Sequence, residues 1–153
     1  MKTFEATLAW DRGAQPFGDQ RYSRAHTWQF DGGLSVPASS SPLSVPLPMS
    51  DPAAVDPEEA LVAAASSCHM LFFLSLAAAR GLVVDSYRDR ATGILDGDER
   101  GRQAIVRIVL RPRIAFAGAP PEAAVLAGLH REAHARCYIA SSLRGEVVVE
   151  EEA

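Results

Sequence analysis

An α+β fold is predicted by the order in which strand-like and helix-like segments follow one another. Three β-type segments come first, a long apolar helical segment follows, and then come two further strands, a second helix and a last strand. Alternating βα units of a parallel sheet would give a different order. The 153 residues, 48% of them hydrophobic, suffice for one core, so we expect a single domain over residues 1–153.

The first third of the chain has the period-two pattern of strands. Apolar and polar side chains alternate over residues 4–10 and again over 22–30. The sequence Asp31-Gly32-Gly33 predicts a turn into a further strand at 34–36. Residues 37–57 hold six of the ten prolines and predict a long irregular loop, which in a compact domain is often functional.

A helix is predicted over residues 57–80. Asp56 can cap it, Pro57 suits the first helical position, and Glu59 completes a capping box, while Gly81 is a helix stop. Because residues 60–79 are apolar nearly all round, the helix should be covered on most sides. The segment is also long enough to span a bilayer, but it contains serines, a cysteine and a histidine, so we expect no membrane contact.

The last part of the chain predicts a hairpin, two helices and a strand. The hairpin arms are residues 82–95 and 103–116 around a turn at 96–101, with a bulge or break near Pro112. A helix should begin at residues 120–122 and run to about Ala135. Residues 137–143 follow as a short helical piece, and residues 146–150 as the final strand.

Charge and cysteine usage restrict the function classes. A net charge of −4 and a pI near 5.5 give no electrostatic footprint for nucleic acid. The first ten residues lack the pattern of a signal peptide, so we expect a cytoplasmic protein. In that reducing compartment a disulfide between the two cysteines, Cys68 and Cys137, would be catalytic or sensing more often than structural.

Two other interpretations of these residues remain open. Both cysteines could be small buried hydrophobic residues in a protein that binds a ligand without chemistry. Alternatively, a metal could bind to side chains spaced along one helical face, with two more nearby. The residues of that set are His130, His134 and Cys137, together with Cys68 and His69.

The segment from Asp56 to Cys68 resembles the Asn/Asp-Pro-Glu-x-Leu-x-Ala-Ala-x4-Cys motif of the OsmC/Ohr family, the osmotically inducible and organic hydroperoxide resistance proteins. Residues 137–143 resemble the segment around the second cysteine of that family. The resemblance implies mixed and antiparallel sheets around a long buried central helix, in an intertwined homodimer. His69 and Tyr138 depart from the family pattern, which indicates a divergent OsmC-like branch.

The resemblance also implies an activity, the thiol-dependent reduction of organic hydroperoxides to alcohols at the dimer interface. Cys68 would be the reactive thiolate, and Cys137 would form a disulfide with its sulfenic acid. An arginine, Arg24 or its neighbour Arg21, would favour the thiolate and would itself be held by Glu58.

The remaining expectations concern substrate and partners. Two roles are open for Met70, Leu71 and Phe72: an apolar wall that favours bulky organic peroxides, or ordinary core packing. No metal or other resident cofactor is expected, but an external dithiol must reduce the disulfide. That reductant would be a lipoyl protein, a thioredoxin-like protein or a small thiol.

Overall fold

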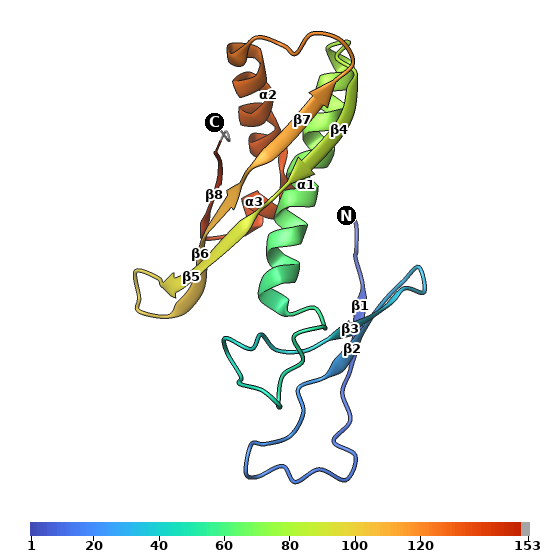
Figure 1. The fold of residues 1–153 in the computed structure, drawn as a ribbon, viewed down its shortest axis with the longest axis vertical. Helices are drawn as coiled ribbons and strands as arrows, with labels where there is room; N and C mark the ends of the chain where they lie inside the picture. The colour runs from blue at the N-terminus through green and yellow to red at the C-terminus, as the bar shows by residue number, and fades with distance from the viewer. Residues whose placement is uncertain (151–153) are drawn as a thin grey trace. The chain divides into compact units, whose positions relative to one another are not determined.

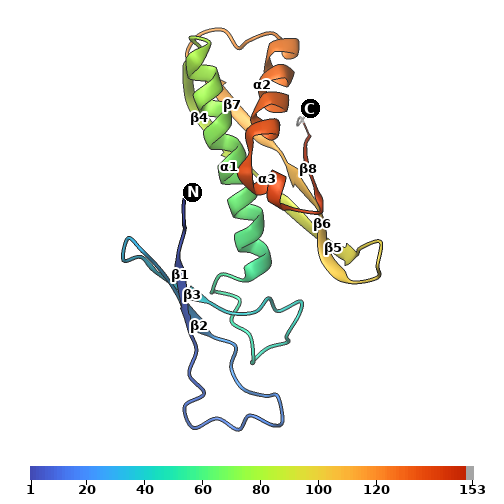
Figure 2. The same ribbon diagram turned by 180° about the vertical axis from the view of Figure 1, so that it is seen from behind.

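The computed structural model describes residues 1–150, and Figures 1 and 2 show it as a ribbon from opposite sides. Contacts within the chain define two compact units, Met1–Ala60 and a second that begins at Leu61. In the described residues the strands form three small sheets, which together with the helices confirm the predicted α+β class.

The first unit contains an antiparallel sheet of three short strands. These are β1 (Ala6–Ala9), β2 (His26–Phe30) and β3 (Ser35–Ala38), with β2 in the centre. The predicted turn after β2 is present, and Gly33 adopts a φ of 86°, which a residue without a Cβ tolerates. The predicted strands are therefore confirmed, but the first two are shorter than expected.

The loop after β3 is irregular, as predicted, and is held by polar contacts. Ser39 is fully buried, and its hydroxyl accepts a hydrogen bond from the Asp51 N–H at 3.0 Å. An isolated bridge joins Ala38 to Val55 and brings the chain to the start of the first helix.

Helix α1 (Pro57–Ala79) begins and ends where the local signals predict. The Asp56 carboxylate accepts the Glu59 N–H at 2.7 Å, and the Glu59 carboxylate accepts the Asp56 N–H at 3.4 Å, which is the predicted capping box. Gly81 has a φ of 72° and donates its N–H to the Ala78 carbonyl at 3.0 Å, ending the helix. The end predicted at residue 80 is wrong by one position.

The predicted hairpin is present, but both arms are broken. The first arm consists of β4 (Val84–Asp89) and β5 (Thr92–Gly97), and the second of β6 (Gln103–Leu110) and β7 (Pro112–Phe116). Strands β4 and β7 form one antiparallel sheet. Strand β8 (Glu146–Val149) joins β5 and β6 in another, parallel to β6.

Asp89 lies at the end of β4 and explains why the break between β4 and β5 lies opposite the break between β6 and β7. One of its carboxylate oxygens accepts the Arg111 N–H at 2.6 Å, in the gap between β6 and β7. The other accepts the Ser66 hydroxyl of α1 at 2.5 Å. The break near Pro112 was expected, but the one after Asp89 was not, because its cause is a contact between residues far apart in the sequence.

Two shorter helices complete the second unit. Helix α2 (Ala123–Arg136) and helix α3 (Tyr138–Ser142) confirm the two predicted helical segments, and α2 lies beside α1 in both views (Figures 1 and 2). Two clusters of buried side chains form the core. One joins α1 to α2 and contains Phe73, Leu76, Ala77, Leu129 and Ala133. The other joins α1 to the sheet of β8 and contains Ala65, Ile108, Leu110 and Val147.

Within this single chain α1 is covered on one side only. Its buried residues are Ala65, His69, Phe73, Leu76 and Ala77. On another side Leu71 is 60% exposed, and Ser67 and Ala63 are exposed as well. The described residues therefore do not confirm the predicted cover on most sides of α1.

Candidate functional site

The structure brings the two cysteines together. Cys68 lies in the middle of α1 and is half-buried, whereas Cys137 is fully buried at the junction of α2 and α3. Both are free thiols, and Cys68 lies close enough to Cys137 to raise the pKa of the Cys137 thiol. Because α2 ends before Cys137 and α3 begins after it, the side chain of Cys137 also caps α3, accepting the Ala140 N–H at 3.4 Å.

The surroundings of Cys137 favour the protonated form of its thiol. Burial raises the pKa of the Cys137 thiol above its ordinary value, and the Ala140 N–H opposes this shift. The neighbouring Cys68 side chain raises that pKa further. Cys137 therefore holds its proton more tightly than an ordinary thiol, and the half-buried Cys68 is the better placed of the two to act as a nucleophile.

Aromatic side chains flank the thiol pair. Phe72 lies one turn after Cys68, on the same face of α1, and meets the Tyr138 ring edge-on with centroids 5.1 Å apart. Leu71 also lies on that face and is exposed, whereas Met70 is half-buried. Sequence reasoning did not assign a role to Tyr138, although its position directly after Cys137 was a signal that could have done so.

The predicted activating residues lie apart from the thiols along the chain. Glu58 belongs to the first turn of α1, ten residues or about 15 Å of helix before Cys68. Among residues 1–150 it forms no ion pair with Arg24 or Arg21. Cys68 and the two arginines lie in different compact units. Activation of Cys68 by an arginine stays a prediction.

Arg24 is held in a fixed position within its own unit. Its guanidinium lies 3.8 Å from the centre of the Tyr22 ring and donates hydrogen bonds to the carbonyls of Gln20, at 2.7 Å, and of Tyr22. Its backbone N–H donates to the Met49 carbonyl at 2.7 Å. Carbonyl oxygens and an aromatic face leave the positive charge of Arg24 without a neutralising carboxylate. Arg21 is exposed and lacks these contacts.

His69, which departs from the family pattern, is a core residue paired with His130. Both are buried, and the Nε2 of His69 lies 3.0 Å from the Nδ1 of His130, with the rings stacked. Burial and the neighbouring charges of His130 and His134 lower the pKa of His69 to about 4. His69 is therefore neutral at physiological pH and packs against α2 rather than facing solvent.

The alternative metal site is not assembled. Helix α2 ends at Arg136 and Cys137 has an extended backbone, so the predicted helical face does not continue to the cysteine. His130 is buried while His134 is exposed. No three His, Cys, Asp or Glu side chains within residues 1–150 are grouped so that they could hold a metal ion. The prediction of one shared helical face was wrong, because the last turn of the helix does not persist.

Helix α1 is also the one helix in the described part of the chain that is long and apolar enough to cross a membrane. Its polar groups nevertheless pair with protein, since Ser66 bonds Asp89 and His69 bonds His130. Such contacts are typical of a helix that packs against protein.

Comparison with known proteins gives consistent results. The family model described as OsmC-like protein matches residues 50–152. An OsmC-like protein of unknown function from Vibrio cholerae is 48% identical, with a TM-score of 0.97, and the match covers 99% of this chain and 100% of that one. An organic hydroperoxide resistance protein from Elizabethkingia anophelis is 16% identical, with a TM-score of 0.71 over 99% and 94% of the two chains.

A further structure, an organic hydroperoxide resistance protein OsmC from Legionella pneumophila, is also 16% identical, with a TM-score of 0.67 over 99% and 96% of the two chains. At this identity the last two comparisons show a common fold. No curated protein sequence matches the chain significantly.

Proposed function

Because the chain belongs to the OsmC-like family, we propose that it is a thiol-dependent peroxidase that reduces organic hydroperoxides to alcohols. The observation that carries this proposal is the proximity of Cys68 to Cys137, whose positions are 69 residues apart in the sequence. Two free thiols in contact, one half-exposed and one buried, form the arrangement that a disulfide-forming peroxidase needs.

In the first step the Cys68 thiolate attacks the terminal oxygen of the hydroperoxide. A sulfur–oxygen bond forms, the O–O bond breaks, and the alkoxide leaves and takes up a proton to become the alcohol. Cys68 is thereby oxidised to a sulfenic acid. Phe72 and Tyr138 give this position an apolar border, which favours an organic substrate over hydrogen peroxide.

In the second step Cys137 resolves the sulfenic acid. Its sulfur attacks the Cys68 sulfur, the S–O bond breaks, and water leaves with the proton of the Cys137 thiol. An external dithiol then reduces the disulfide and restores both thiols. Contact between the thiols before the reaction means that this step needs little rearrangement.

A thiolate in a half-buried position needs a positive charge nearby, because burial disfavours the charged form. Arg24 is the best candidate, since its guanidinium is fixed against Tyr22 and has no carboxylate partner in the described residues. Arg24 is therefore the residue that we propose to favour the Cys68 thiolate.

The second copy is also part of the proposal. In the unit Met1–Ala60 the one buried hydrophobic residue is Ala38, and large apolar side chains of its strands are exposed. A unit of this size without an apolar core is marginal alone. Together with the uncovered side of α1, it supports a homodimer in which each copy supplies the missing cover.

The peroxidase proposal is tested by turnover of cumene hydroperoxide with dihydrolipoamide as reductant. Wild type should consume peroxide, Cys68→Ser should be inactive, and Cys137→Ser should form a sulfenic acid that dimedone traps but turn over poorly. Ser67→Ala, which changes an exposed neighbour of Cys68, is the matched control and should behave as wild type. Turnover unaffected by Cys68→Ser would leave a ligand-binding protein without this chemistry.

The dimer is tested by sedimentation equilibrium of the wild type and of Leu71→Lys. We expect twice the chain mass of 16.4 kDa for the wild type and weaker association for the variant, since a charge replaces an apolar contact. Arg90→Gln, an exposed change on the connection between β4 and β5, is the control. A wild-type protein that sediments as a monomer at all concentrations contradicts the proposal.

A further inference from the structure

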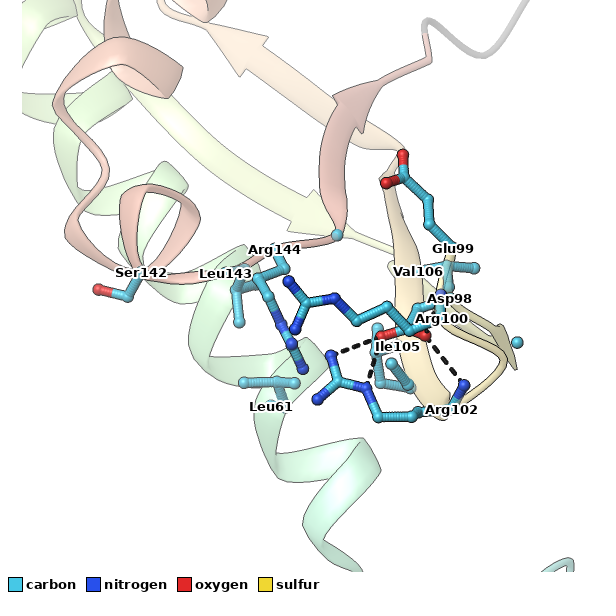
Figure 3. A pocket seen from close by; sticks show the side chains of 13 residues that line it. Leu61, Asp98, Glu99, Arg100, Arg102, Ile105, Val106, Ser142, Leu143 and Arg144 are labelled. Carbon is cyan, nitrogen blue, oxygen red and sulfur yellow. Dashed lines mark hydrogen bonds and ion pairs between the residues drawn. The ribbon is translucent and has the colours of Figure 1, made fainter.

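A pocket at the open end of the second unit contains three arginines that neither thiol chemistry nor the core uses. It lies between the turn that joins β5 to β6, the segment before β8 and the start of α1, and has a volume of about 690 Å³ (Figure 3). Arg100 and Arg102 come from the turn and Arg144 comes from the segment before β8. All three side chains point into the same space (Figure 3).

The backbone is shaped to hold Arg144 at this position. Gly145 passes so close to β6 that an added Cβ would collide with the carbonyl oxygens of Ile105 and Val106, the latter at 2.8 Å. Only glycine permits this approach. Arg144, the residue before Gly145, is therefore held at the edge of β6, beside the pocket.

Asp98 neutralises only one of the three positive charges. Arg102 donates from Nε at 3.1 Å and from Nη2 at 2.9 Å to one oxygen of Asp98, and its N–H donates to the other at 2.9 Å. These bonds, the backbone one first, hold the pKa of Asp98 below its ordinary value, so the carboxylate is charged and saturated. Glu99 points away from the pocket (Figure 3).

Three guanidinium groups thus surround one carboxylate, since the charge of Arg144 also acts on Asp98 without forming a hydrogen bond to it. Within residues 1–150, the side chains of Arg100 and Arg144 form no hydrogen bond or ion pair. Like charges held close together repel, and a bound anion would relieve this repulsion through charge-assisted hydrogen bonds. Guanidinium groups match the planar or tetrahedral oxygens of carboxylates and phosphates.

Apolar side chains form another part of the lining. Leu61, Ile105, Val106 and Leu143 border the same space, and Leu143 and Ile105 also pack against the core cluster of α1 and β8. Inorganic phosphate would leave this apolar surface in water. An anion with an alkyl chain would cover it and gain the corresponding hydrophobic free energy.

We propose that this pocket binds an amphiphilic organic anion, with its carboxylate or phosphate group on Arg100 and Arg144 and its alkyl chain on the apolar lining. The inference goes beyond the peroxidase proposal and uses neither Cys68 nor Cys137. A failure of either one leaves the other unaffected.

The test is an NMR titration of the full chain with octanoate, octyl phosphate, octanol and inorganic phosphate at low ionic strength. Octanoate and octyl phosphate should shift the amide signals of Gly97 and Gly145 saturably, while octanol and inorganic phosphate bind much more weakly. Arg100→Gln and Arg144→Gln should each weaken binding by about fivefold, the value for loss of one partly exposed ionic contact. Arg90→Gln, outside the pocket, should leave binding unchanged.

Octanoate binding that both glutamine variants retain in full overturns the proposal, as does octanol binding as tight as that of octanoate. Inorganic phosphate that binds as tightly as octyl phosphate overturns the assignment to an amphiphile. Arg144→Lys keeps the charge but not the fork of donors, and it should lie between wild type and Arg144→Gln.

Discussion

The buried pair of His69 and His130 predicts that the protein loses stability in mild acid. The pKa of His69 is about 4 in the folded chain against 6.5 as its ordinary value, so the unfolded chain binds the proton more readily between these values. The contribution of neutral His69 to the free energy of unfolding is fully present above pH 6.5 and is lost as the pH falls toward 4. From pH 7 to pH 4.5 the two pKa values give a loss of about 2 kcal/mol in the free energy of unfolding.

Urea denaturation at pH 7 and at pH 4.5 measures this loss. His69→Gln removes the titrating group and keeps a donor and an acceptor toward His130. Its stability should depend less on pH than that of the wild type, by about 2 kcal/mol. His134→Gln removes only the smallest of the three causes that lower the pKa of His69, so it should reduce the pH dependence much less than His69→Gln does.

NMR titration of the His69 ring in the wild type gives the same answer without a variant. The ring signal should not titrate above pH 5. A midpoint near 6.5, or equal pH dependence in wild type and His69→Gln, would refute the assignment of His69 to a neutral buried pair.

Three further predictions concern stability and thiol reactivity. Calorimetry of Gly145→Ala should show a free energy of unfolding lower by about 3 kcal/mol, because the added Cβ clashes with β6. Gly128→Ala is the control, since Gly128 lies at an open position inside α2, and its free energy of unfolding should rise by up to about 1 kcal/mol. Asp56→Ala should cost about 1 kcal/mol, and Asp56→Asn much less, because asparagine still caps α1. Iodoacetamide should label Cys68 well before Cys137, which is buried and has a raised pKa, and equal rates for both at pH 7 contradict the order of ionisation.

The parts of the fold that the sequence predicts well are determined by local signals. Asp56, Glu59 and Gly81 bound α1 through contacts within a few residues, so both ends were predicted to within one position. Cys68 and Cys137 could be paired before the structure was known, because the resemblance to the OsmC/Ohr family covers the segments of both.

The features that the sequence could not predict depend on contacts between distant residues. The second break in the hairpin follows from Asp89, which bonds both α1 and the opposite arm. The role of His69 depends on a partner 61 positions away. The arginine pocket forms because Gly145 lies directly against β6 and so holds Arg144 beside that strand. The close packing of Gly145 on β6 is a contact between distant residues, and no local sequence pattern predicts it.

The central claim is that peroxide oxidises Cys68 and that Cys137 then closes a disulfide with it. Mass spectrometry of protein treated with one equivalent of cumene hydroperoxide, without reductant, measures this directly. We expect a product that is lighter than the reduced chain by two hydrogens and in which a disulfide joins the peptides of Cys68 and Cys137. Oxidation that stays on Cys68 as added oxygen with Cys137 still free, or a chain that does not react, would contradict it.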